Sequence, residues 1–242
     1  MKQTLFITGT DTGAGKTVLT ALLTRFLRAR SVNAAALKPV CSGSRADARA
    51  LHAAMHGALT LDEINPWHFL APVAPLLAAR REGRRMKLSQ VLAHARAMQK
   101  RFDVLLVEGA GGLLSPLGVC SGGLRPSHAS ALPERRHKER FDSCDLILAL
   151  HAIPIIVAQN KIGVVNHVLL TLEALPKTLR AKARVVLMSP RRPDAATKSN
   201  AKLLAELAGA KIFSLPWLGK DFLAVEVLKK PGVKRTLQGL LD

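Results

Sequence analysis

Residues 3–17 read QTLFITGTDTGAGKT, and this stretch decides the fold. Leu5, Phe6 and Ile7 predict a buried strand over residues 3–8, and the apolar spacing of residues 16–30 predicts a helix. The loop between them is rich in glycine and ends in Gly-Lys-Thr, as loops do that hold phosphate on main-chain N–H groups. It is one residue longer than the usual pattern. Either this is a chance string in a basic protein or the loop is built around something besides a nucleotide, and its place between a predicted strand and a predicted helix favours nucleotide binding.

The alternation of strand and helix continues along the chain. Further strands are expected at 33–40, 102–112, 153–160, 183–189 and 210–216. Further helices are expected at 45–57, 87–101, 164–175 and 194–209, while residues 59 to about 85 form a looser segment that contains prolines. Because the strands are nearly continuous apolar runs, we predict an α/β fold, with a parallel sheet covered by helices on both faces. We expect one domain over residues 1–242.

The composition excludes several classes of protein. Hydrophobic residues make up 48% of the 242 residues, which excludes a disordered chain. The longest apolar stretch, residues 146–158, is interrupted by His151 and Pro154 and is too short to span a membrane. The N-terminal residues leave no room for a signal peptide. Three cysteines without metal-ligand spacing favour a reduced, cytoplasmic protein, with a disulfide between Cys120 and Cys144 as the alternative.

The net charge of +19 favours anionic partners such as nucleotides, carboxylates, nucleic acid or acidic membrane surfaces. A solvated basic surface is the alternative. Residues 117–146 are rich in arginine and lack periodicity before Asp145. A long irregular segment in a compact domain is either functional or disordered. We expect a passive, poorly ordered basic insertion near residues 119–140.

Charged residues stand where ligands gather in a parallel sheet, at the carboxyl ends of the strands. Glu108 ends an apolar strand, where a charge is costly unless it is paired, and this favours a role at a metal site. Lys38 ends another strand and either extends into solvent or points into the site. Asp47 lies in the first turn of a helix, where it is either a partner of the helix dipole or a metal ligand.

In its motifs the chain resembles the dethiobiotin synthetases, ATP-dependent enzymes of biotin synthesis with a P-loop NTPase fold. The segments ITGTDTGAGKT, ALKPVCSGS, DARAL, VEGAGGLLSPL, GVVNHVLLTLEAL and LPWL occur in the order typical of that family, and the longer glycine loop is part of its pattern. The resemblance covers roughly residues 3–117 and 145–218. It implies that CO₂, or bicarbonate, and 7,8-diaminopelargonate form a carbamate. ATP then phosphorylates this carbamate, and ring closure gives dethiobiotin, ADP and phosphate, with Mg²⁺ as the metal.

The resemblance also implies roles for the matching residues. The catalytic residues would be Lys38, Lys16 and Thr12, with Lys38 between the carbamate and the γ-phosphate. Mg²⁺ would bind to Thr17, Asp47 and Glu108. The nucleotide would contact Gly13, Ala14, Gly15, Lys16, Thr17, Val18, Glu108, Gly109, Ala110, Gly111, Pro216, Trp217 and Leu218. The substrate would contact Thr12, Ser42, Gly163, Val164 and Asn166.

Residues 161–167, KIGVVNH, resemble the family segment whose helix start binds the distal carboxylate of the substrate across a dimer interface. The resemblance therefore implies a homodimer that works on small molecules, without a membrane or a specific nucleic acid as partner. The chain departs from the family at one strand end, where Met188 and Ser189 stand in place of an Asn-Asp pair whose asparagine reads adenine. A methionine cannot make the paired hydrogen bonds of an amide, so the preference for ATP over other nucleoside triphosphates is left open.

Other functions are possible for a chain of this kind. A partition-type ATPase switch would share the architecture and would use the basic surface to bind DNA or a membrane. Such switches usually carry an additional lysine early in the loop, where this chain has residues 10–12, Thr-Asp-Thr. An amidating ligase would need a glutaminase domain, for which the chain has no room. A non-enzymatic nucleic-acid binder would be expected to show a basic patch interleaved with aromatic residues, which is missing here.

Overall fold

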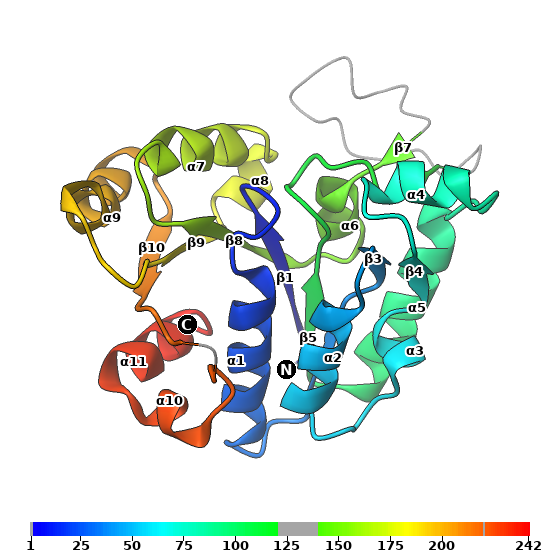
Figure 1. Ribbon diagram of the computed structural model, residues 1–242, viewed down its shortest axis with the longest axis horizontal. Coiled ribbons are helices and arrows are strands. Elements are labelled where there is room, and N and C mark those ends of the chain that lie inside the picture. The colour runs from blue at the N-terminus through cyan, green and yellow to red at the C-terminus, as the bar shows by residue number, and fades with distance from the viewer. Residues whose placement is uncertain (1, 121–139, 220) are drawn as a thin grey trace.

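The computed structural model describes residues 2–120, 140–219 and 221–242. The expected disorder near 119–140 therefore falls almost entirely outside the described residues. Within the described part, six strands form one parallel sheet in the order β10-β9-β8-β1-β5-β2 (Figure 1). These strands are β1 (Gln3–Gly9), β2 (Ala34–Leu37), β5 (Val104–Glu108), β8 (Ile153–Gln159), β9 (Arg184–Met188) and β10 (Lys211–Leu215). The predicted α/β architecture with a parallel sheet is confirmed.

Helices cover both faces of this sheet (Figure 1). One group packs around α1 (Lys16–Arg28), which contacts α2 (Ala46–Ala54) and α11 (Pro231–Gly239); α10 (Val225–Lys229) packs on α11. On the other side α5 (Leu88–Arg101) contacts α6 (Ser143–Ala149), and α7 (Val164–Glu173) contacts α9 (Ala195–Leu207). The remaining described helices are short: α3 (Leu61–Ile64), α4 (Pro75–Arg81) and α8 (Lys177–Arg180). Among the described residues, no helix is both long and apolar enough to cross a membrane.

The central strand β1 carries the glycine-rich loop. Leu5, Phe6 and Ile7 are fully buried between β5 and β8, as the apolar run predicts. The loop follows at the carboxyl end of β1, and α1 begins at Lys16 with Gly15 as its N-cap. A strand, a glycine-rich turn and a helix in this order place the helix N-terminus at the edge of the sheet where ligands bind.

The strand register brings the predicted charged residues together. Ile7 of β1 is paired with Glu108 of β5, and Leu37 of β2 is paired with Val107. Lys38 therefore follows its strand at the level of Glu108, next to the glycine-rich loop. This convergence follows from parallel strands whose carboxyl ends lie on one edge of the sheet.

The strand predicted over residues 33–40 is divided. It leaves the main sheet after Leu37, and a short strand β3 (Val40–Ser42) pairs instead with β4 (Trp67–Phe69). Pro39 lacks the N–H group that a continuing ladder would need, and its carbonyl accepts a hydrogen bond from the N–H of Trp67. The looser segment from residue 59 to about 85 thus contains a strand and two helices, α3 and α4. At the ends of the basic insertion, β6 (Gly118–Val119) and β7 (Arg140–Phe141) pair antiparallel.

Candidate functional site

The glycine-rich loop wraps the start of α1 with two residues in the left-handed region, Gly13 at φ +74° and Gly15 at φ +99°. Any residue with a Cβ would be strained at these angles. The Nζ of Lys16 donates a hydrogen bond to the carbonyl of Asp11, 2.9 Å away across the loop. The loop thus holds its lysine folded back over the main chain, where an anion could replace the carbonyl as its partner.

Lys38 lies at the centre of a buried charged cluster. Its Nζ is 2.7 Å from Glu108 Oε1 and 3.0 Å from Asp47 Oδ2, and it also donates to the carbonyl of Gly109 at 3.0 Å. The hydroxyl of Thr17 donates to the same Glu108 oxygen at 2.8 Å. The side chains of Lys38 and Glu108 are 5% and 0% exposed, while that of Asp47 is 43% exposed. A charge this deeply buried is tolerated because it is paired.

The pKa values of the two lysines are shifted in opposite directions. Burial, and after it the positive charge of Lys38, lower the pKa of Lys16 to about 8, and the nearby carboxylates offset this lowering only in part. Burial alone would also lower the pKa of Lys38, but the carboxylates of Glu108 and Asp47 outweigh burial and raise this pKa above its usual value. Lys38 in turn holds the pKa of Asp47 below its usual value, although burial acts in the opposite direction. At neutral pH Lys38 therefore stays protonated. An anion that binds beside Lys16 would raise the pKa of Lys16 and so stabilise its charged form.

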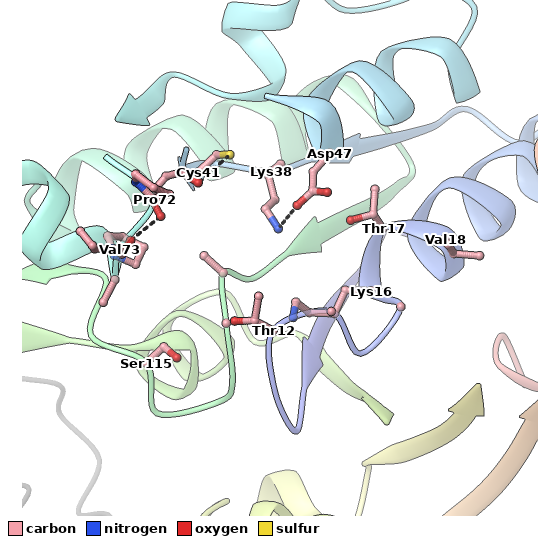
Figure 2. A pocket seen from close by; sticks show the side chains of 17 residues that line it. Thr12, Lys16, Thr17, Val18, Lys38, Cys41, Asp47, Pro72, Val73 and Ser115 are labelled. Carbon is pink, nitrogen blue, oxygen red and sulfur yellow. Dashed lines mark hydrogen bonds and ion pairs between the residues drawn. The ribbon is translucent and has the colours of Figure 1, made fainter. Parts of the chain in front are cut away.

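A cavity of about 740 Å³ opens beside this cluster (Figure 2). Lys16, Thr17 and Val18 line one side from the start of α1, and another side is lined by Lys38, which follows β2, and by Asp47 of α2. Figure 2 shows Lys38 and Asp47 facing each other on the far side of the cavity from Thr12 and Lys16. The other lining residues are Gly13, Gly15, Cys41, Ser42, Pro72, Val73, Ala74, Pro75, Ala110, Gly111 and Ser115. A space of this size with cations on two sides can hold a polyanion together with a second molecule.

An apolar segment, residues 72–75, forms the wall opposite the glycine-rich loop. The hydroxyl of Ser42 donates a hydrogen bond of 2.6 Å to the carbonyl of Val73 and so ties this wall to β3. Cys41 of β3 also lines the cavity; it donates its thiol hydrogen to the carbonyl of Ser44 at 3.0 Å, and burial raises the pKa of the thiol. Neither the wall nor Cys41 and Ser115 are among the site residues expected from the sequence. The only sequence signal for the wall is the run of residues 71–76, APVAPL, which lacks helical or strand periodicity.

The structure brings many of the expected site residues to this cavity but not all. The lining includes Thr12, Gly13, Gly15, Lys16, Thr17, Val18, Lys38, Ser42, Asp47, Ala110 and Gly111. Ala14 and Glu108 are buried behind the lining, and Gly109 contributes the carbonyl that Lys38 binds.

The remaining expected residues lie outside this cavity. Gly163 caps the exposed start of α7, followed by the buried Val164 and the exposed Asn166. Pro216, Trp217 and Leu218 follow β10, and Trp217 is 55% exposed. Met188 lies beside the glycine-rich loop, because a Cβ added to Gly15 would be 2.9 Å from its Cγ.

One buried oxygen in the cluster has no partner. Glu108 Oε2 makes no hydrogen bond to any described group, although Oε1 is shared by Lys38 and Thr17. A buried acceptor without a partner is costly and suggests that a cation or donor supplied by a ligand completes the site. Within the described part of the chain, no group of three or more His, Cys, Asp or Glu residues has the arrangement of a metal centre built from protein alone. A metal here would need oxygens from a hydroxyl and from a ligand, as Mg²⁺ sites on phosphates do.

Comparisons with known proteins support one family. A family model described as an AAA domain matches residues 3–120. A curated relative, the ATP-dependent dethiobiotin synthetase BioD of Anaeromyxobacter dehalogenans (strain 2CP-C), is 39% identical over 219 residues, which cover 88% of this chain and 89% of the relative. Proteins of the same name from Thermodesulfovibrio yellowstonii and Akkermansia muciniphila are 33% and 31% identical, over 95% and 93% of this chain and 96% and 97% of the relatives. Among solved structures, the hydrogenase maturation factor HypB from Archaeoglobus fulgidus aligns with a TM-score of 0.48 and 14% identity over 99% of this chain and 89% of that chain, a likeness too weak to carry an argument.

Proposed function

The chain belongs to the ATP-dependent dethiobiotin synthetase family, and from this premise we propose that it uses ATP to join CO₂ to 7,8-diaminopelargonate and close the ring of dethiobiotin. The observation that carries the proposal is that Lys16 and Lys38, which come from different strand ends, line one cavity beside the glycine-rich loop. A carbamate that attacks a phosphate sets one anion against another. Lysines on two sides of the cavity would offset this repulsion, because fixed cations stabilise the negative charge that develops in the transition state.

The two lysines take different roles in this proposal. The main-chain N–H groups of the loop and Lys16 hold the β- and γ-phosphates of ATP, and Lys16 exchanges the Asp11 carbonyl for a phosphate oxygen. Lys38, fixed by Glu108 and Asp47, directs its charge to the point where the carbamate oxygen meets the γ-phosphate. The second amine of the substrate then attacks the carbamoyl phosphate and releases inorganic phosphate.

The reacting end of the diamine lies, in this proposal, near Thr12 and Ser42. Both residues line the cavity, together with the bare main chain of Ala110 and Gly111. An added Cβ at Gly111 would lie 2.4 Å from the hydroxyl oxygen of Ser115, so a side chain at this position would crowd the site. The apolar residues 72–75 are suited to the aliphatic part of the substrate.

Mg²⁺ fits the oxygens of Thr17, Asp47 and Glu108. The fit rests on the unpaired Glu108 Oε2, on the half-exposed carboxylate of Asp47 and on the Thr17 hydroxyl beside them. When bound, Mg²⁺ would neutralise charge on the phosphate oxygens. Glu108→Gln should therefore shift the Mg²⁺ concentration needed for half-maximal turnover upward at saturating ATP. A titration identical to that of the wild type would assign Glu108 to structure alone.

The more distant expected residues complete the proposal. Pro216, Trp217 and Leu218 would form a wall for the nucleotide base, and the exposed indole of Trp217 is free to stack on it. The start of α7, at Gly163, Val164 and Asn166, would bind the distal carboxylate of a substrate held in the second copy of a homodimer. These three residues do not line the main cavity of their own chain. In the homodimer they would instead meet the carboxylate of a substrate bound in the cavity of the other copy.

The proposal also covers the setting of the enzyme. We infer that residues 1–242 form a single domain that works in the cytoplasm without a specific nucleic acid or membrane partner. Binding to random DNA would then reflect charge only and would collapse as salt is raised. DNA binding that persisted at high salt would contradict this part of the proposal.

The direct test is synthesis of the product. Purified protein is incubated with ATP, bicarbonate and 7,8-diaminopelargonate, and dethiobiotin is detected by its mass. Reactions without ATP or without the diamine serve as controls, and a catalytic Lys38→Ala variant should lose at least about 100-fold in turnover. Absence of the cyclic urea with folded protein would overturn the proposed function.

A further inference from the structure

Lys38 follows β2, which lies at the edge of the main sheet. Among the described residues, no strand of that sheet neighbours the main chain on its outer side, and Pro39 cannot donate a hydrogen bond. The position of the Lys38 ammonium nevertheless has to be exact for it to meet a phosphate. Something other than the sheet must therefore hold this peptide.

The end of α3 supplies that support to both main-chain groups of Lys38, its N–H and its carbonyl. The N–H of Lys38 donates to the carbonyl of Ile64 at 3.0 Å. The side-chain amide of Asn65 donates to the carbonyl of Lys38 at 2.8 Å, and it also reaches the carbonyl of Pro39 at 3.4 Å. Asn65 is only 1% exposed, so these bonds are made without competing water.

Asn65 is itself held by the half-buried guanidinium of Arg45. Arg45 donates from Nε to Asn65 Oδ1 at 3.2 Å and from Nη2 to the carbonyl of Asn65 at 3.0 Å. The amide orientation is therefore defined, because a reversed amide would place its donors against Arg45. Arg45 stands at the N-cap of α2, two residues before Asp47, which is the half-exposed partner of the Lys38 ammonium.

We propose that Asn65 is a positioning residue for Lys38, with Arg45 holding Asn65 in place. The inference rests on the proposed function, because it assigns Asn65 to the step that Lys38 supports. Asn65 lies outside the cavity lining and touches no reacting atom, so its effect must pass through the Lys38 main chain. A displacement of about 1 Å at a catalytic group can cost about 100-fold in rate.

The test uses Asn65→Asp, which keeps the shape of the side chain but sets an oxygen against two carbonyl oxygens. We expect kcat to fall by about 10- to 100-fold. The KM for ATP should change much less than kcat, because the glycine-rich loop and Lys16, on a different strand end, keep most of the phosphate contacts. A loss that appears in kcat alone indicates an interaction made in the transition state.

A double-mutant cycle separates positioning from a general loss of structure. In a Lys38→Ala background, Asn65→Asp should cause no further fall in kcat, because the side chain that it positions is gone. A merely structural role would lower activity by the same factor in both backgrounds. Equal factors in the two backgrounds, or wild-type kcat for Asn65→Asp, would overturn the inference.

The matched control is Asn33→Asp at the opposite end of β2. Asn33 also donates its side-chain amide to a main-chain carbonyl, that of Arg101, at 3.0 Å. The Asn33→Asp substitution should leave kcat unchanged. A fall in kcat equal to that caused by Asn65→Asp would contradict the inference. If Asn65→Asp fails to fold, Arg45→Met loosens the same amide from a half-buried position, and its smaller fall in kcat should likewise vanish in the Lys38→Ala background. The failure of the wild type to make dethiobiotin would instead overturn the proposed function.

Discussion

Replacing Lys38 by methionine tests whether the buried charged cluster is paired as the distances indicate. The substitution removes the cation but keeps much of the side-chain volume. It leaves Glu108, whose side chain is fully buried, without its 2.7 Å partner. Removing one partner of a buried ion pair typically costs ~3–5 kcal/mol of unfolding free energy.

The structure places the expected cost near the lower end of that range. Thr17 still donates a hydrogen bond to Glu108 Oε1, which preserves part of the compensation. Asp47, with 43% of its side chain exposed, can regain water, and loss of its pair costs little. We therefore expect a loss of about 3 kcal/mol for Lys38→Met, or a fall in Tm of about 6–12 °C for a chain of this length.

Thermal and urea unfolding of the free protein at pH 7 measure this effect. The raised pKa of Lys38 means that its contribution to stability is complete at this pH and would be lost only at strongly alkaline pH. The double variant Lys38→Met with Glu108→Gln removes both charges and should recover at least half of the loss, since a neutral buried pair leaves no charge uncompensated. A Lys38→Met protein as stable as the wild type, or a double variant less stable than either single one, would refute the pairing.

The wild type should gain stability relative to Lys16→Met as the pH rises from about 8 to about 10.5, because the lowered pKa leaves the unfolded chain with more bound protons in this window. Urea unfolding at several pH values measures the difference, and a constant difference would mean that the amine is not buried in solution. Gly15→Ala should abolish tight ATP binding, since φ is +99° and the new Cβ would lie 2.9 Å from Met188 Cγ; an unchanged Kd by calorimetry would show that the loop adapts. Replacing residues 121–138 by a short turn should leave turnover largely intact, because β6 and β7 already hold the two ends side by side. Complete loss of turnover in a folded variant would show that this segment takes part in the reaction.

The sheet and the charged cluster could be predicted because they depend on long, strongly patterned segments. Parallel strands end on one edge of the sheet, so the strand ends alone place Lys38 and Glu108 near the glycine-rich loop. The distance of 2.7 Å between Lys38 Nζ and Glu108 Oε1 in the structure agrees with that argument. Apolar runs and helical spacing of this length leave few alternatives.

The parts that could not be predicted are built from short elements. Helix α3 has 4 residues and β4 has 3, too few for a period to be recognised. Asn65 and the wall at residues 72–75 both come from this segment. Their positions depend on tertiary contacts, such as the hydrogen bonds from Arg45 and Ser42, that leave no local pattern in the sequence. The helices α10 and α11 near the C-terminus were not expected either.

A crystal structure of the protein with Mg²⁺ and a non-hydrolysable ATP analogue tests the central claim most directly. We predict that the terminal phosphate lies in the cavity, within hydrogen-bond distance of both Lys16 and Lys38, with the triphosphate wrapped by residues 9–17. A terminal phosphate outside hydrogen-bond reach of Lys38, or a triphosphate bound away from this loop, would contradict it.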